Sequence, residues 1–553
     1  MKRTLLRLLF APCLWTVAAG SAAPLPAAGA APEDGASLFS NGRFESDRKS
    51  AGWPDDWPRS KGCTWEKEGD VRFLRLQSSK PGEMVMVFRQ AVLPSPAPPG
   101  LEIRLRFRYN GIQPGEKSWF DGRVIGHFKS ESGRTLKPEP RTPAFHGSSK
   151  GWVDETYIVK VPAHAHSLEL MPALFQAAAG TLDLAQCEVF PVPAERIPPW
   201  VTVPSATIVP AHPEALPPEL RVDGNRLRTK DGKEVWLQGL CVDSLEWTAA
   251  GEHLAESLPV AIEQWKANVI RLSMNDAFWT GRGPWQHKDG GAAYRKLVDA
   301  AVEAAASRGA YLVLDLHRFG APMPEHLEFW KDAAVRYKNH PAVLFELFNE
   351  PHSVSWKVWR DGGDLTAAEN KHADANAAEN KEEPTGEWSP GMQAMVDAIR
   401  GTGATNVIIA GGLDWGYDLS GVAGEYALRE RAGGCGIMYS SHIYPWKKDW
   451  QTRVLEAAAK YPVFVGEVGT PPDWKSFQFI PPEQRTEPLG TEDWPRDMLG
   501  LIQKHKLNWT GFSFHPKCGP CVILDWQYTP TPYWGVYVKD ALAGHAFELK
   551  KMR

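Results

Sequence analysis

The sequence lacks several features that would assign it to a common class of protein. Its net charge of −4 is small for 553 residues, so the charge gives no reason to expect nucleic acid or an anionic membrane as a partner. No phosphate-binding loop, nucleotide-binding glycine fingerprint or repeat of fixed period is present, and no motif indicates a metal ion or an organic cofactor. The composition, with 43% hydrophobic and 23% charged residues, is that of a globular protein.

Long apolar runs and cysteines are also scarce. A basic start precedes the apolar run 8–19 and a group of small residues that ends at Ala23, which is the layout of a secretory signal peptide over residues 1–23. That run is too short to span a membrane, and no other run is long enough. Outside the signal six cysteines remain, too few for a disulfide scaffold in so long a chain. We expect a secreted or periplasmic monomer.

The hydrophobic pattern and the proline content divide the remaining chain into two domains and a connector. Residues 36–192 carry short alternating stretches such as "LEIRLRFRY" between turn residues, which predicts an all-β jelly-roll sandwich. Residues 193–219 are a proline-rich linker. From 220 to 553, apolar runs of strand length alternate with amphipathic helical stretches, which predicts a (β/α)8 barrel. The expected strands are 235–242, 268–273, 311–317, 343–350, 407–411, 437–443, 463–467 and 509–514. The expected helices are 293–308, 325–337, 392–400, 450–460 and 493–505.

Polar side chains recur at the ends of the predicted barrel strands. "NVIRLS" places Arg271 there, "YLVLDLH" His317, "VLFELFNEPH" Asn349 and Glu350, "YSSHIY" His442 and Tyr444, and "PVFVGEVG" Glu467. Active sites of (β/α)8 enzymes lie at this end of the barrel. A lone polar residue is more often structural, but five strands with the same pattern predict one site. The polar insertion 361–387 after the fourth strand is expected at the rim of that site.

Two of these residues are carboxylates on separate strands, which favours acid/base chemistry on a neutral substrate. Glycoside hydrolysis needs such a pair, one carboxyl protonated to help the leaving oxygen depart and one ionised. Arg271 beside one of them would keep it charged.

The segments "FELFNEPH" and "VFVGEVGT" resemble the two signature strands of glycoside hydrolase family 5, the cellulase-type retaining barrels. The resemblance covers most of residues 220–542. It implies that Glu350 is the general acid/base, that Glu467 is the nucleophile and that Asn349 binds the 2-hydroxyl of the sugar at the cleavage point. It further implies that Arg271 and Tyr444 orient the nucleophile, that His317 contacts the same sugar and that His442 supports the acid/base.

One position departs from that family pattern. The family usually has a tryptophan on the eighth strand as a platform for the sugar, whereas "WTGFSFHP" places Phe512 there. Phenylalanine still stacks but lacks the indole N–H. The chain has 24 tryptophans, and Trp415, Trp446 and Trp526 near other strand ends are candidate platforms, with packing at the rim as the alternative for each.

The first domain resembles jelly-roll carbohydrate-binding modules through "NGRFES", "GWPDDWP" and "AAAGTLDLAQCEVF". Most of its tryptophans are expected in the core. Trp119 is the best candidate for a sugar contact.

Three functions compete. The first is a secreted retaining endo-β-glycosidase acting on β-1,4-glucan, with mannan or another β-glycan as the alternative substrate. The second is a carbohydrate-binding protein with little catalysis. The third is a thiol oxidoreductase, because Cys518 and Cys521 lie in "CGPC". The third needs a helix after the first cysteine, but "VILDWQYTPTPYWG" predicts loop or a short strand, so we expect a turn at the barrel mouth.

Overall fold

The structure is a computed structural model that describes residues 35–49, 51–78, 80–116, 120–283, 286, 288–366, 370 and 388–553. The chain divides into two compact units between Thr202 and Val203. The expected signal peptide, Trp119 and most of the insertion 361–387 lie outside the described residues.

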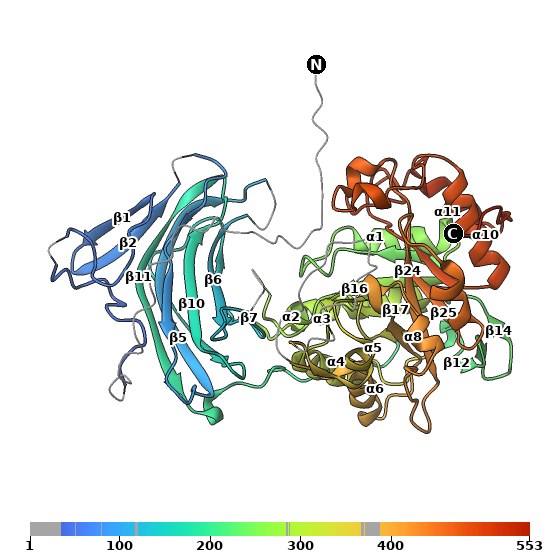
Figure 1. The fold of residues 1–553 in the computed structure, drawn as a ribbon, viewed down its shortest axis with the longest axis horizontal. Coiled ribbons are helices and arrows are strands. Elements are labelled where there is room, and N and C mark those ends of the chain that lie inside the picture. Colours follow the sequence, from blue (N-terminus) through green and yellow to red (C-terminus); the bar gives the residue numbers. More distant parts are fainter. Residues whose placement is uncertain are drawn as a thin grey trace, which may run out of the picture. The chain divides into compact units, whose positions relative to one another are not determined.

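The N-terminal unit is a sandwich of two antiparallel sheets (Figure 1). One sheet has the strand order β1-β2-β11-β5-β9, and the other has the order β3-β10-β6-β7, with β4 paired to β10 and β8 paired to β6. This confirms the predicted β-sandwich. The strands are β1 (Cys63–Glu68), β2 (Val71–Gln77), β3 (Val85–Met86), β4 (Arg89–Val92), β5 (Gly100–Gln113), β6 (Gly122–Lys129), β7 (Thr135–Leu136), β8 (Ala144–Phe145), β9 (Val153–Lys160), β10 (Ser167–Leu174) and β11 (Ala179–Val192).

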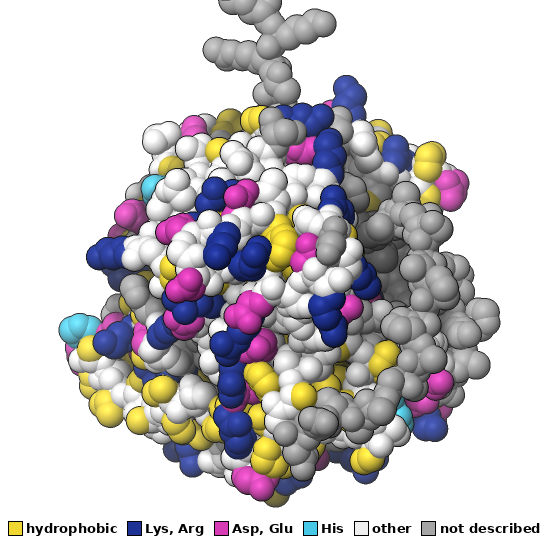
Figure 2. All heavy atoms as spheres, turned by 90° about the vertical axis from the view of Figure 1, so that its left-hand side faces the viewer, with side chains coloured by type: hydrophobic (Ala, Val, Ile, Leu, Met, Phe, Trp, Pro, Cys, Tyr) yellow, Lys and Arg dark blue, Asp and Glu magenta, His cyan; other side chains and the backbone are white. Residues whose placement is uncertain are grey.

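Strand β5 shows why this segment forms a sandwich. Ile103, Leu105 and Phe107 point into the shared core and are buried, while Arg106 and Arg108 alternate with them on the other face. Figure 2 views the molecule from the side on which β1, β2, β11 and β5 lie in Figure 1. Basic and acidic side chains are interspersed there, so this face presents no patch of one sign.

The connector between the units is bonded to its surroundings at both ends. The short helix η1 (Ala194–Arg196) brings Arg196 to the carboxylate of Glu102 in the sandwich. Farther on, Ser205 donates to Asp332 at 2.6 Å, on a helix of the second unit. A second short helix, η2 (Pro213–Ala215), precedes the barrel.

The C-terminal unit contains a closed barrel of eight parallel strands, which confirms the predicted (β/α)8 fold. The predicted strands match within a few residues at each end, with two differences. The first strand is interrupted at 236–237, and the fourth ends at Glu346, before Asn349 and Glu350. The barrel strands are β15 (Gln238–Val242), β16 (Val269–Met274), β17 (Tyr311–Leu316), β19 (Val343–Glu346), β23 (Ile408–Gly411), β24 (Ile437–Ile443), β25 (Val463–Val468) and β26 (Asn508–Gly511).

A small antiparallel sheet covers the N-terminal end of the barrel. Leu220 and Leu227 of this sheet pack with Val269, Val313 and Ile409 from the barrel interior. This apolar layer closes one end of the barrel, so polar chemistry is confined to the other end. The sheet strands are β12 (Leu220–Asp223), β13 (Arg226–Thr229) and β14 (Glu234–Val235).

Helices cover the outside of the barrel (Figure 1). Helix α10 shows the pattern, because Met498, Leu501 and Ile502 form its buried stripe. The five predicted helices are found, the fourth as a π-turn that continues into α9. The helices are α1 (Leu254–Pro259), η3 (Val260–Gln264), α2 (Asp276–Trp279), α3 (Ala292–Ala306), α4 (Pro324–Arg336), α5 (Trp356–Asp361), α6 (Gly391–Gly401), α7 (Leu413–Gly416), α8 (Ser420–Ala423), η5 (Gln451–Leu455), α9 (Glu456–Ala458), η6 (Trp474–Phe477), η7 (Pro482–Gln484), α10 (Asp493–His505) and α11 (Gly535–Leu542).

Within the part of the chain that the structure describes, none of these helices combines the length and apolarity needed to cross a bilayer.

Candidate active site

The polar side chains predicted at the strand ends lie together at the C-terminal mouth of the barrel. Arg271 is in β16, His442 is in β24 and Glu467 is in β25, and His317 follows β17 directly. Asn349 and Glu350 follow β19, where Glu350 starts the two-residue strand β20 (Glu350–Pro351) and pairs with β18 (Phe319–Gly320). That extra pairing fixes the backbone of Glu350 above the barrel, where the sequence pattern alone predicted a continuous strand.

Arg271 is the centre of the site and is fully buried. Its guanidinium donates to Glu346 Oε2 at 2.6 Å, to Asn349 Oδ1 at 2.7 Å and to Glu467 Oε1 at 3.0 Å, and it lies 3.1 Å from Asp315 Oδ2. Burial opposes its charge, but the surrounding carboxylates hold its pKa well above the ordinary value. Arg271 is therefore a permanent cation that fixes four oxygen-bearing side chains.

Asp315 and Glu346 were missed by the sequence analysis. Both are fully buried, and each lies in an apolar strand with its side chain toward Arg271. The signal was present in "YLVLDLH" and "LFELFNE", where a carboxylate interrupts an apolar run. Burial raises the pKa of Asp315 to about 7, although Arg271 acts in the opposite direction. His317 Nδ1 lies 2.8 Å from Asp315 Oδ2, and burial lowers the pKa of His317 to about 4.

Glu467 is 4% exposed and is held at both oxygens. Arg271 donates to Oε1, and the Tyr444 hydroxyl donates to Oε2 at 2.6 Å. Burial raises the pKa of Glu467, while Arg271, His317 and the Tyr444 hydrogen bond favour its charged form. Burial also raises the pKa of Tyr444 well above the ordinary value, so this hydroxyl stays a donor.

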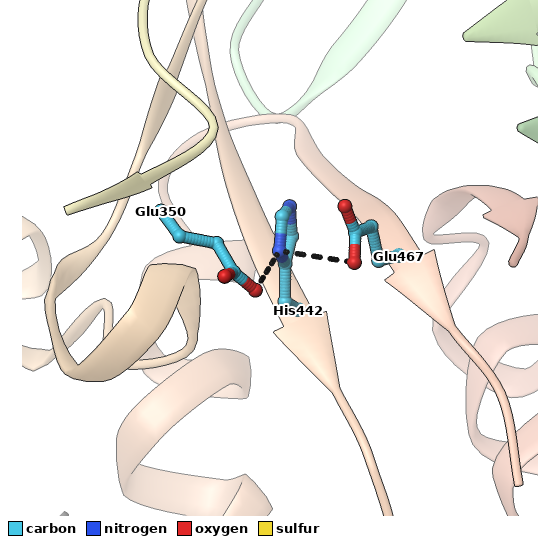
Figure 3. Close-up of side chains that lie close together, drawn as sticks. All are labelled: Glu350, His442 and Glu467. Carbon is cyan, nitrogen blue, oxygen red and sulfur yellow. Dashed lines mark hydrogen bonds and ion pairs between the residues drawn. The ribbon is translucent and has the colours of Figure 1, made fainter. Parts of the chain in front are cut away.

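Glu350 faces Glu467 across His442 (Figure 3). His442 Nδ1 lies 3.0 Å from Glu350 Oε1 and 3.7 Å from Glu467 Oε2. Burial lowers the pKa of His442 well below its ordinary value, with Arg271 adding to the effect, so the ring is neutral. The facing atoms of Glu350, His442 and Glu467 all lie within 4.8 Å of one another.

These three side chains could in principle hold a metal ion, since each offers one ligand atom. Arg271, however, lies 3.0 Å from Glu467 and would repel a second cation. The arrangement therefore favours direct chemistry by the two carboxyl groups and does not favour a metal centre.

Asn349 has an amide group whose Nδ2 is buried and without a hydrogen-bond partner among the described residues, while its oxygen accepts from Arg271. A buried donor without a partner costs free energy. Because Arg271 holds the amide oxygen, the amide is fixed with its Nδ2 group free to donate to a ligand.

The predicted aromatic platforms have different surroundings. Phe512 follows β26, is 8% exposed and packs with Cys241 and Cys518. The half-buried Trp247 packs against the same cluster, and the sequence analysis did not identify this residue. Trp526 is half-buried and stacks on His253 at a centroid distance of 4.2 Å. Trp446 is only 5% exposed, and Tyr444 covers one ring face at 4.9 Å and 6°. This placement favours packing over sugar stacking for Trp446.

Trp415 lies on an unusual turn beside Glu350. Its ring is half-buried and stacks on His352 at 3.7 Å, with the exposed Phe319 6.2 Å away. Both Asp414 and Trp415 have φ of 57°, a conformation that non-glycine residues rarely adopt. Such backbone strain clusters at functional sites.

Cys518 and Cys521 are free thiols, and neither begins a helix, because the next helix along the chain is α11 (Gly535–Leu542). Burial raises the pKa of Cys521 to about 12 and that of Cys518 well above its ordinary value. A redox-active cysteine needs a lowered pKa, so the surroundings of these two thiols do not support the thiol oxidoreductase hypothesis.

Comparisons with known proteins identify the family of the barrel region. A family model described as cellulase (glycosyl hydrolase family 5) matches residues 229–517, just over half of the chain. Endoglucanase E-5 of Thermobifida fusca is 26% identical over 46% of this chain and 48% of its own length. Endoglucanase CelA of Streptomyces lividans is 26% identical over 47% of this chain and 50% of its own. The chain thus spans about half the length of these relatives. A solved β-glucanase of Saccharophagus degradans, in complex with cellotetraose, has a TM-score of 0.47 at 23% identity, covering 63% of this chain and 98% of that one.

Proposed function

Because the chain belongs to glycosyl hydrolase family 5, the cellulase family, we propose that it is an endo-acting hydrolase of β-1,4-glucan that retains the anomeric configuration. The observation that carries this proposal is the facing pair of Glu350 and Glu467, whose nearest atoms lie within 4.8 Å. Retaining glycosidases have carboxyl groups about 5–5.5 Å apart, whereas inverting enzymes need about 6.5–9.5 Å to admit a water molecule.

In the first step of the proposed reaction, the Glu467 carboxylate attacks the anomeric carbon. The glycosidic bond breaks, and its oxygen takes the proton of the Glu350 carboxyl group, so a glycosyl ester on Glu467 and a free sugar hydroxyl result. In the second step, Glu350 accepts a proton from water while the water oxygen attacks the anomeric carbon. Glu467 leaves as a carboxylate, and Glu350 is protonated again.

The neighbours of each carboxyl group suit these roles. Arg271 and Tyr444 donate to the two oxygens of Glu467 and favour its ionised form. The neutral His442 contacts Glu350 and adds no positive charge that would strip its proton. Asn349 Nδ2 would donate to the sugar 2-hydroxyl, and His317 would contact the same ring. Phe512, Trp526 and Trp415 are the proposed platforms.

The sandwich is proposed to bind carbohydrate and hold the barrel close to its substrate, and the enzyme to act outside the cytoplasm. The described tryptophans give limited support for a sugar site there. Trp53 and Trp57 are buried and donate to backbone oxygens, as core residues do. Trp152 is half-buried, with the Arg108 guanidinium 4.5 Å from its ring centre.

The test uses azide as a small nucleophile with an activated aryl β-glycoside. Glu467→Ala should lose activity on the order of 10⁴-fold, and azide should restore turnover and yield the α-glycosyl azide. Glu350→Ala should be rescued with the β-glycosyl azide, because its covalent intermediate still forms. Glu346→Ala, a buried carboxylate with no proposed chemical role, is the control and should not be rescued.

A panel of β-glucan, mannan and xyloglucan would then identify the polymer. Wild-type activity in Glu467→Ala would overturn the assignment. Binding without turnover on the whole panel would favour a carbohydrate-binding protein instead.

A further inference from the structure

A polar pocket of about 240 Å³ lies beside the proposed active site, on loops that follow β23, β24 and β25. Its volume is just below the range of about 300–1,000 Å³ that is usual for small-molecule sites, so it suits one small unit and not a long chain segment. It is lined by Asp414, Tyr417, Trp446, Lys447, Lys448, Asp449, Arg453, Glu483 and Gln484.

The turn α7 connects this pocket to the active site. Gly416, at the end of the turn, lies against the ring of His442 and the backbone oxygen of Asn349. On one side of the turn Trp415 stacks on His352. Asp414, the preceding residue, lines the pocket. Asp414 and Trp415 are adjacent residues of one turn, so the pocket and the Trp415 ring share this element.

The proposed reaction determines which part of the substrate lies on the side of the site that carries Trp415. The general acid must lie beside the departing oxygen, so the leaving sugar lies on the Glu350 side of the site. Trp415 and α7 are on that side, in contact with β20. Phe512 and Trp526 follow β26, which is next to the strand that carries Glu467, and Trp247 follows β15, the neighbour of β26 on its other side. The turn that carries Trp415 and the pocket residue Asp414 is therefore on the leaving-group side.

The walls of the pocket are held in place by bonds within the protein. Lys447, 2% exposed, donates to Asp414 at both its backbone oxygen (2.8 Å) and its carboxylate (3.1 Å). The Tyr417 hydroxyl donates to the backbone oxygen of Lys448 at 2.6 Å, and Arg453 is paired with Asp418. These bonded wall residues therefore need little ordering when the pocket binds a ligand.

Three other side chains of the lining are available for hydrogen bonds to a ligand. Among the described residues, Lys448, Glu483 and Gln484 make no side-chain hydrogen bond or ion pair within the protein. The lining as a whole has three basic and three acidic side chains, so it selects no ion of either sign. Donors and acceptors in equal supply suit a neutral, hydroxyl-rich ligand.

We propose that this pocket binds a neutral sugar unit of the leaving-group segment, at least one position beyond the unit that stacks on Trp415. This inference rests on the proposed function. It makes Lys448, Glu483 and Gln484 determinants of substrate length and of the position of cleavage.

The test compares two substrates with the triple variant Lys448→Ala/Glu483→Ala/Gln484→Ala. A cello-hexasaccharide can fill the pocket, whereas nitrophenyl β-cellobioside carries only a nitrophenyl leaving group and cannot reach it. Each lost hydrogen bond weakens binding by about fivefold, so kcat/KM for the hexasaccharide should fall at least about tenfold. The rate on the nitrophenyl substrate should stay within about twofold of wild type.

Product analysis gives a second measurement. Loss of the pocket should move cleavage of a reducing-end-labelled hexasaccharide toward shorter labelled products. Lys475→Ala removes an exposed lysine that does not line the pocket and should change neither substrate. An unchanged rate on the hexasaccharide, or equal losses on both substrates, would overturn the pocket assignment. A wild-type protein inactive on both substrates would instead overturn the proposed function.

Discussion

At the scale of single residues, Arg271 does most to organise the site. It joins Asp315, Glu346, Asn349 and Glu467, which come from three segments of the barrel. Buried carboxylates are costly unless a cation and hydrogen bonds compensate them. The charge of Arg271 offsets that cost, so the same side chain supports both the fold and the ionised state of Glu467.

Arg271→Met should therefore destabilise the barrel strongly. Removal of one partner from a buried ion pair costs about 3–5 kcal/mol of unfolding free energy. Arg308→Met is the matched control, because Arg308 forms an exposed pair with Glu263 at 2.7 Å that is worth at most about 1 kcal/mol. Urea unfolding of both variants measures the difference. Equal, small losses would contradict the central role of Arg271.

His352 predicts a pH dependence of stability. It is 3% exposed, and burial, with Lys447 adding to the effect, lowers its pKa from 6.5 to about 3. Between these values the unfolded chain binds a proton that the folded chain does not, so stability falls as the pH falls. His352→Phe keeps a ring against Trp415 and should flatten the slope between about pH 4 and 6 by up to about 1.4 kcal/mol per pH unit. Unfolding curves at several pH values test this, and identical slopes would refute it.

At the scale of elements, the segment after β26 forms the floor of the proposed cleft. Phe512 contacts Cys241, Cys518 and Trp247 in one small apolar cluster. The loop that carries Cys518 is held by the Ser513 hydroxyl, which donates to the Cys518 backbone oxygen at 2.8 Å. The "CGPC" turn is thus a wall behind Phe512 and has a packing role.

Phe512→Ala should weaken substrate binding by about fivefold, because an aromatic contact contributes about 1 kcal/mol. Phe512→Trp should lower the melting temperature, since the larger ring has to displace Cys241 or Cys518 from a packed cluster. Phe547→Ala, in the C-terminal tail near α10, is the control for a lost phenyl ring. KM values and thermal melts distinguish these cases. An unchanged KM in Phe512→Ala would argue against a sugar contact.

At the scale of the whole molecule, the chain consists of two units with separate hydrophobic cores. The connector is bonded to the sandwich at Arg196 and to the barrel unit at Ser205. A unit with its own core is expected to fold by itself.

A chain of residues 203–553 should therefore melt within about 2 °C of the barrel transition in the full chain. It should also cleave the nitrophenyl substrate at the same rate and lose adsorption to insoluble glucan, which is the role proposed for the sandwich. Calorimetry and a pull-down on insoluble glucan measure both. A truncated barrel that unfolds or aggregates would show that the units are interdependent.

The sequence by itself determined the barrel, the sandwich and the positions of the polar side chains at the strand ends. Periodicity reports which residues are buried, and parallel strands carry their carboxyl ends to one edge. It did not determine which groups meet across the barrel. Asp315 and Glu346 became part of the site only through their contacts with Arg271.

The tertiary structure also decided the roles of the aromatic residues and the pocket. Trp446 and Trp415 each follow the end of a barrel strand within a few residues. The Trp446 ring is buried against Tyr444, whereas the Trp415 ring, stacked on His352, is only half-buried. The pocket beyond Trp415 is made by loops that are distant in sequence. Periodicity encodes the environment of each residue along its own element, whereas contacts between loops depend on the path of the whole chain.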